Sequence, residues 1–352
     1  MYLRHLIILP MALLSCAQGV CDTIDVRISE LESDLEKIRT QTSLGNYGAK
    51  TASAAPQTTG CGLFITADFL WWKLYEGGTE YALKNKNAPF NANSIRGPIK
   101  HLNFEWEPGF KVGLGYLFGR DGWDIYLDYT RFETHAHSSA SSEIEGLFPL
   151  MGLETSGFAK AKAHWHVEFN DIDLTLGRSY FVSKYLALHP QFGLTAAWIQ
   201  QHRHAHYSNL PSSALKLNGK NNFWGIGPRI GADAQFYLGR NFSVYADAAG
   251  ALLWGDFHVK EKEKNTVAGT EIYELRYNLH RMVAAIDFGM GLSFETNFNN
   301  DACHFMIKTG YEGQYWWRQN QLPIFNSSAV DFTRESEDLS LQGLTVDFRL
   351  DF

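Results

Sequence analysis

Seven histidines recur at every second position in three short stretches of the chain. These residues are His135 and His137, then His164 and His166, and then His202, His204 and His206. Alternate residues of a β-strand point to the same face, so each stretch would present its imidazoles on one side of a strand. Neutral imidazoles at cross-strand distances suit Zn²⁺, Cu²⁺ or Ni²⁺. One hypothesis for this pattern is therefore a metal site.

The arrangement of these histidines depends on the register between their strands. If residues 182–184 form a three-residue turn, antiparallel pairing sets His164 opposite His202. The connection over residues 138–163 can likewise set His137 opposite His164. Without a bulge, the parity of each strand would put all seven imidazoles on the outer face.

We favour a second interpretation, in which the histidines form a polar rim without a metal. Val167 and Phe169 follow the middle pair and indicate a β-bulge that turns His164 and His166 inward. The remaining histidines would then contact lipopolysaccharide or titrate near the ordinary histidine pKa.

Charged residues with the opposite strand parity form a second candidate site, the interior of a closed barrel. The acids are Asp68, Glu107, Asp124, Asp128, Asp173, Asp233, Asp247, Asp287, Glu312 and Asp347, and the bases are Lys111, Arg229, Arg281, Lys308 and Arg349. The excess of acids predicts a mild preference for cations if these residues line a pore. The alternative is a ladder of salt bridges that closes the barrel, because barrels of about eight strands are filled by side chains.

Glycines share this interior parity. They are Gly113, Gly115, Gly177, Gly193, Gly225, Gly227, Gly231, Gly289, Gly291 and Gly310. Positions without side chains would leave room for water, which favours a narrow channel. The same glycines could instead ease the tight curvature of the wall.

The elements that position both sites are predicted by a period-two pattern. Apolar residues keep one parity for several residues at a time, which is typical of membrane β-strands. The ten expected strands lie within residues 65–71, 110–118, 123–129, 172–176, 186–198, 224–236, 242–254, 282–292, 305–311 and 344–352. Ten is an even number, as bacterial barrels require, and twelve is the alternative.

The connections between these strands alternate in length. Tight turns are expected at residues 119–122, 182–184, 239–240 and 297–301, and long polar segments near 74–103, 132–164, 203–221, 258–272 and 318–338. Bacterial barrels have short periplasmic turns and long external loops. Residues 79–84 and 167–169 are candidates to extend strands above the membrane.

Tryptophans cluster toward the long-segment end. They are Trp71, Trp72, Trp106, Trp165, Trp198, Trp224, Trp254, Trp316 and Trp317, whereas Trp123 lies at the opposite end. The placement predicts an aromatic girdle at a membrane interface.

Composition argues against three other classes of protein. Aromatic residues make up 14% of the 352 residues and charged residues 20%, yet no run of about 20 apolar residues follows the first stretch, which argues against a helical membrane bundle. A net charge of −7 argues against nucleic acid as a partner. Four cysteines are too few for a disulfide scaffold.

We expect three segments in the N-terminal region, followed by a barrel over residues 61–352. Residues 1–17 resemble a signal peptide, and a lipid on Cys16 is the weaker alternative. Residues 22–44 form an expected periplasmic coiled-coil helix, followed by a linker at 45–60. The apolar seam within 24–38 predicts a homo-oligomer, with a periplasmic partner or a helix lying on the barrel rim as alternatives.

Several stretches then resemble one known family. They are GLFITADFLWWK from Gly62, EPGFKVGLGY from Glu107, DGWDIYLDYT from Asp121 and the closing LTVDFRLDF. With the N-terminal heptads and the linker, they are similar to the major outer membrane protein family of Legionella and chlamydia-like bacteria, which is described as pore-forming. The resemblance implies an outer-membrane barrel. The terminal strand ending at Phe352 also resembles the signal read by the barrel-assembly machinery.

Together these observations predict an all-β transmembrane antiparallel barrel in the bacterial outer membrane, with both termini periplasmic. We expect a porin-like protein that passes small cationic or neutral solutes, or alternatively a structural or adhesive envelope barrel with little conductance. No enzymatic activity and no cofactor are expected, because we find no serine–histidine–aspartate spacing and no paired acids at the rim. The expected partners are outer-membrane lipid and lipopolysaccharide. Cys61 and Cys303 could pair within one chain or between neighbouring chains.

Overall fold

The computed structural model describes residues 62–86, 96–118, 122–143, 146–153, 156–183, 185–209, 213–239, 241–298, 303–328 and 331–352. The expected signal peptide, coiled-coil helix and linker, and Cys61, lie outside these residues. No helix within the described ranges is both long and apolar enough to cross a membrane.

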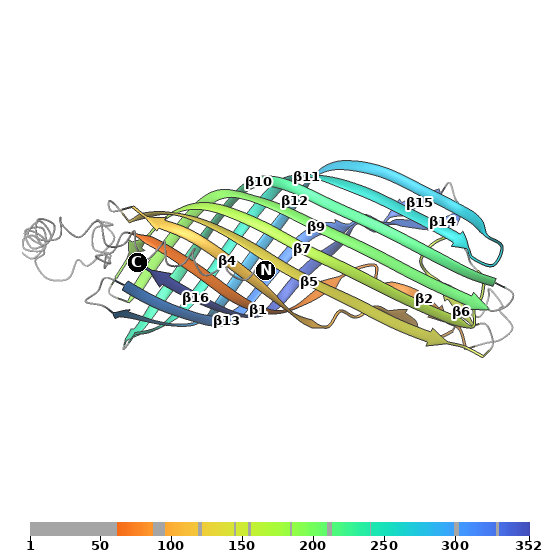
Figure 1. Cartoon of the computed structure of the whole chain (residues 1–352), viewed down its shortest axis with the longest axis horizontal. Coiled ribbons are helices and arrows are strands. Elements are labelled where there is room, and N and C mark those ends of the chain that lie inside the picture. Colours follow the sequence, from red (N-terminus) through yellow and green to blue (C-terminus); the bar gives the residue numbers. More distant parts are fainter. Residues whose placement is uncertain are drawn as a thin grey trace, which may run out of the picture.

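Ten antiparallel strands form the wall of a closed barrel (Figure 1). They are β1 (Leu63–Glu76), β4 (Trp106–Leu117), β5 (Trp123–Ser141), β7 (Lys160–Arg178), β9 (Leu186–Asn209), β10 (Ser213–Gly239), β11 (Phe242–Asn265), β12 (Thr270–Phe298), β13 (Cys303–Asn320) and β16 (Glu337–Asp351). Each strand pairs with the next in this order, and β16 pairs with β1 to close the wall. The predicted barrel of ten strands is confirmed.

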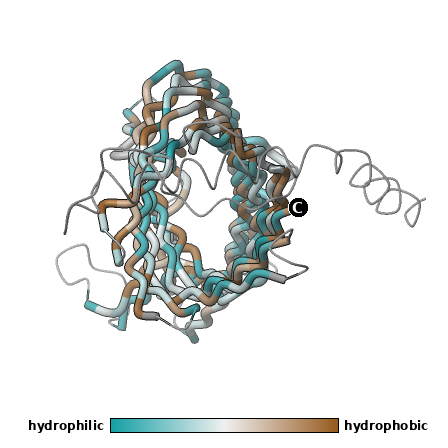
Figure 2. Tube along the Cα trace, turned by 90° about the vertical axis from the view of Figure 1, so that its left-hand side faces the viewer, coloured by the Kyte–Doolittle hydropathy of each residue, from teal (hydrophilic) through white to brown (hydrophobic). Residues whose placement is uncertain are grey.

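Side chains alternate between the two faces of the wall, as the period-two pattern predicts. In β4, Phe110, Val112 and Leu114 are exposed on the outer face, while the residues between them point inward. Figure 2, a view toward one end of the barrel, shows apolar and polar residues alternating along the strands around the ring. The exposed apolar positions form the surface that meets lipid.

We call the end where β1 begins and β16 ends the proximal end, and the opposite end the distal end. Strands β9 to β12 are 24 to 29 residues long. A tilted membrane strand needs only about 9–11 residues. These strands therefore project beyond the membrane at the distal end, and much of the predicted loops at 132–164, 203–221 and 258–272 is in fact strand.

Smaller elements occupy the distal end. Strands β2 (Glu80–Lys84), β3 (Ile99–His101) and β6 (Leu147–Pro149) form a three-stranded sheet, and β14 (Pro323–Ser328) pairs with β15 (Asp331–Arg334). Two-residue β8 (Tyr180–Phe181) pairs with β9 near the proximal end. Residues 80–84 thus form a separate sheet instead of extending the wall. Residues 167–169 do extend a wall strand, as predicted.

Candidate functional site: the barrel interior and the outer histidine rows

The interior-facing charges gather into clusters that join different strands. Arg229 of β10 reaches Asp173 of β7, with 3.3 Å between Nε and Oδ2. It also donates from Nη1 to Oδ1 of Asp287 on β12 over 3.0 Å. One guanidinium therefore links three strands of the wall through two carboxylates.

Lys111 is the centre of a second cluster. Its Nζ donates to Oε1 of Glu312 over 3.0 Å, across the interior from β4 to β13. Thr345 donates to the other oxygen of Glu312 over 2.9 Å, and Trp72 Nε1 donates to Thr345 over 3.1 Å. Asp68 lies directly opposite Lys111 in the register between β1 and β4. These contacts tie the shortest wall strands to the C-terminal ones.

His189 forms a third cluster that the sequence reasoning missed. Its Nε2 lies 2.7 Å from Oδ2 of Asp124, and its Nδ1 lies 3.0 Å from Oδ2 of Asp233. Gln191, which lies on β9 with His189, donates to Oδ1 of Asp233 over 3.1 Å. The interior parity of His189 within β9 was the signal that could have identified it.

Most of the predicted pore-lining residues thus face the interior, with one departure. Glu107 lies where β4 begins, and its Oε1 is 3.7 Å from Nδ1 of outward-facing His135. The register of β4 against β5 changes between the pair Gly109–Phe132 and the bridge Phe104–Ala136, which brings Glu107 to the rim. Arg281 remains inside and donates to Oε1 of Gln321 over 2.9 Å.

Aromatic side chains fill the interior distal to these clusters. The ring centroids of Phe169 and Trp316 lie 5.5 Å apart, in a T-shaped contact. Their strands, β7 and β13, are five positions apart in either direction around the ten-stranded wall, so the two rings meet across its full width. A neighbouring cavity beside Arg229 measures only about 10 Å³, roughly the space of one water molecule.

The predicted tryptophan girdle requires a correction. Trp71, Trp106, Trp198, Trp224 and Trp254 are exposed on the outer face, but Trp72, Trp165 and Trp316 are buried inside the barrel. Parity explains the difference: Trp71 and Trp72 are adjacent, so they point to opposite faces of one strand.

Segments between the wall strands add an apolar plug at the distal end. The plug consists of Tyr81, Leu102, Leu147, Met151, Phe158 and Leu322, all almost completely buried. Tyr207 of the wall donates to the backbone oxygen of Tyr81 over 2.6 Å, and the Tyr81 hydroxyl lies 3.0 Å from Ser138 Oγ. The plug therefore rests on the inner face of β5 and β9.

At three of the interior glycines, the space of the missing side chain is occupied by a neighbouring residue. A Cβ at Gly115 would overlap the Phe64 ring, one at Gly177 would overlap His189, and one at Gly310 would overlap the Tyr245 hydroxyl. Side chains from neighbouring strands cover these positions. At these three positions the absence of a side chain makes room for the side chain of a nearby strand.

A buried charge pair lies distal to the aromatic layer. Arg203 donates to Oε2 of Glu261 over 2.8 Å, and Tyr273 donates to Oε1 of the same carboxylate over 2.8 Å. The Glu76 carboxylate nearby accepts from Gln201 over 2.8 Å. Burial raises the pKa of Glu76, which lies beyond the exposed tryptophans and outside the membrane-spanning part.

The seven predicted histidines all lie on the outer face of β5, β7 and β9. His166 lies opposite both His135 and His202, and His164 lies opposite both His137 and His204, giving two parallel rows. The predicted pairing of His137 with His164 is confirmed, but that of His164 with His202 is wrong by two residues. The turn between β7 and β9 is longer than three residues and carries β8, so the register differs.

The predicted bulge after His166 is also wrong. The register of β7 against both neighbours runs without a shift from residue 160 to 177, so Val167 and Phe169 face inward while His164 and His166 face outward. The rings of His135 and His164, and those of His166 and His202, are 6.3 Å apart between centroids. Partial burial and the neighbouring positive charges lower the pKa values of His164 and His202, which lie outside the membrane.

The sequence matches the family described as Legionella pneumophila major outer membrane protein precursor over residues 58–352. The chain belongs to this family. Together with the closed barrel, this membership places the protein in the bacterial outer membrane.

No curated protein sequence matches the chain. Among solved structures, the outer membrane protease OmpT from Escherichia coli shares 8% identity at a TM-score of 0.41, covering 85% of this chain and 98% of that one. The CymD monoaromatic hydrocarbon channel shares 9% identity at a TM-score of 0.34, with coverage of 88% and 94%. Ail of Yersinia pestis shares 12% identity at a TM-score of 0.24, with coverage of 82% and 98%.

Proposed function

We propose that this protein is an outer-membrane envelope barrel with little conductance in its resting state. One observation carries the proposal: the rings of Phe169 and Trp316 meet across the full width of the interior. Ionic clusters occupy the interior on the proximal side of this contact, and the apolar plug occupies it on the distal side. A solute would have to displace packed side chains to pass.

Such a barrel serves as a rigid anchor for a surface structure. Strands β9 to β12 extend well beyond membrane thickness, and their inner faces pack against the plug. The proposal places the proximal end, with its short turns, in the periplasm and the distal end outside the cell. The extended strands and the segments between them are then what the protein presents to its surroundings.

A porin-like function, with passage of small cationic or neutral solutes, is the second candidate. The acid excess among the interior charges favours it, because carboxylates in a pathway attract cations. On this view the plug and the aromatic layer form a closed state, and Lys111 with Glu312 and Arg229 with Asp287 line the path that opens. The candidate therefore requires a rearrangement of Phe169 and Trp316.

Liposome swelling distinguishes the two functions. Wild-type protein, purified and refolded into liposomes, should give no faster swelling with a small sugar than empty liposomes. A Phe169→Ala, Trp316→Ala variant removes both rings that meet across the interior and should raise the rate only slightly, because the ionic clusters and the plug remain in place. A matched Trp198→Ala variant removes an exposed outer tryptophan and should stay at background. Rapid swelling with wild-type protein would overturn the first proposal and support the porin-like one.

A further inference from the structure

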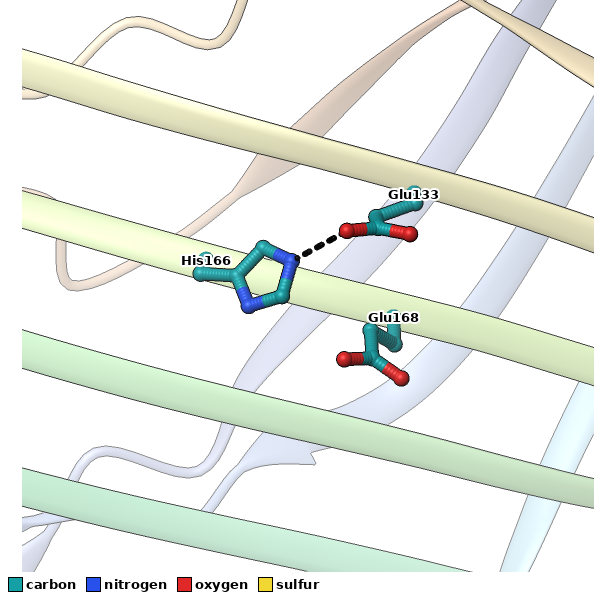
Figure 3. A group of neighbouring side chains, drawn as sticks. All are labelled: Glu133, His166 and Glu168. Atoms are coloured by element: carbon teal, nitrogen blue, oxygen red, sulfur yellow. Dashed lines mark hydrogen bonds and ion pairs between the residues drawn. The ribbon is translucent and has the colours of Figure 1, made fainter.

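Two carboxylates and an imidazole converge on the outer face of β5 and β7. Glu133 Oε1 lies 3.0 Å from Nε2 of His166, and one side-chain oxygen of Glu168 completes the group. The three potential ligand atoms all lie within 4.8 Å of one another. Figure 3 shows the His166 ring beside Glu133 and Glu168, which come from neighbouring strands.

The backbone register makes this convergence a fixed feature of the wall. Glu133 and Glu168 are direct cross-strand partners, so their Cβ atoms are held on the same face at close range. Like charges in this position are unfavourable by themselves. A cation between the two carboxylates removes that repulsion.

A second imidazole stands beside the group. His202 of β9 lies opposite His166 in the register, with 6.3 Å between the ring centroids. His135 of β5 is the other cross-strand partner of His166. Side chains from two further positions can therefore supply a fourth ligand without any change in the backbone.

We propose that Glu133, His166 and Glu168 bind a zinc ion on the outer face of the barrel, with His202 as the fourth ligand. Zn²⁺ takes His nitrogen at about 2.0–2.1 Å and carboxylate oxygen at about 2.0–2.2 Å in tetrahedral sites. Such bond lengths place ligand atoms roughly 3.4 Å apart, so the side chains must draw together slightly from their present positions. Rotation of exposed glutamates is sufficient for this.

The donor set selects among metals. Mg²⁺ and Ca²⁺ are bound through oxygen atoms, so the imidazoles at the centre of this group are a poor match for them. Imidazole together with carboxylate suits Zn²⁺. The bound ion would connect β5, β7 and β9 on the distal side of exposed Trp198, which lies opposite Asn170, and so act as a cross-strand link.

The test uses full-length protein without an affinity tag, refolded in detergent, treated with chelator and then desalted. Competition with a chromophoric zinc chelator gives the stoichiometry and the dissociation constant for Zn²⁺. We expect one ion per chain and at least tenfold weaker binding in His166→Ala and in Glu168→Gln. Zinc should also raise the unfolding temperature of wild-type protein but not that of His166→Ala.

Two further variants keep the outcome specific. His258→Ala removes an outward-facing histidine of β11 that bonds to Asn278, away from this group, and should bind within twofold of wild type. A His164→Ala, His204→Ala variant removes two members of the other histidine row and should do the same. Equal binding by wild type and His166→Ala would overturn the proposal. So would an equal loss in the His164, His204 variant, because the metal would then belong to that row.

Discussion

Replacing Arg229 by leucine tests whether the interior charges act as a paired cluster. The side chains of Arg229, Asp173 and Asp287 are only 15%, 10% and 17% exposed, so little water compensates a lost partner. Removing one member of a buried ion pair costs about 3–5 kcal/mol, because it leaves an uncompensated charge. We expect the free energy of unfolding of Arg229→Leu to fall by about that amount.

The assay is urea unfolding of the detergent-refolded barrel, followed by the change in gel mobility between folded and unfolded forms. A second variant, Arg229→Leu with Asp173→Asn and Asp287→Asn, removes the stranded charges as well. It should recover much of the loss, since replacing a whole buried ion group is often neutral or stabilising.

Arg276→Gln is the matched control. Arg276 pairs with Glu274 on the outer surface, where its side chain is 69% exposed, so the change should alter stability by less than about 1 kcal/mol. A loss below 1 kcal/mol in Arg229→Leu, equal to that in the control, would refute the reasoning. The interior charges would then be solvated and not paired.

Three further predictions follow from the packing and from the sequence. Gly115→Leu should prevent correct folding or lower the unfolding temperature strongly, because the Phe64 ring occupies the space of any side chain there. Gly250→Ala offers a milder comparison, because an added Cβ there would meet nothing closer than 3.8 Å. Glu76→Gln should raise the free energy of unfolding at pH 7, because the raised folded-state pKa of Glu76 makes its ionised carboxylate unfavourable in the folded barrel. Below pH 4 the carboxyl is protonated in both states, so the variant and the wild type should be equally stable. A difference in stability that stays constant between pH 7 and pH 4 in urea titrations would contradict this prediction. Deletion of residues 22–40 should leave the barrel folded but weaken chemical cross-linking between chains, and equal cross-linking would exclude the apolar seam as the contact.

The wall of the barrel was predictable because its signal is local and repeated. Outer positions such as Phe110, Val112 and Leu114 follow one parity, and lipid contact requires nothing more specific of them. The same parity placed Lys111 and Arg229 inside. The same parity also predicts that Trp72 and Trp316 face the interior. The expectation of a tryptophan girdle instead placed them on the outer face.

The remaining features depend on contacts between distant residues. The plug contains strands of three to five residues, too short to show a period, and its position is set by contacts such as that of Tyr207 with Tyr81. The histidine register depended on the true length of the turn before β9. The role of the glycines depended on which side chains, Phe64 for example, lean over them.

A planar-bilayer recording of the wild-type protein tests the central claim most directly. The interior is filled from the charged clusters to the distal plug, so the account predicts no single-channel steps above background across a salt gradient. In the same recording, the Phe169→Ala, Trp316→Ala variant should show small steps. Steady steps in wild-type protein, with a reversal potential shifted toward that of the cation, would contradict the claim. So would a smaller shift of the reversal potential in the double variant Asp128→Asn, Asp287→Asn.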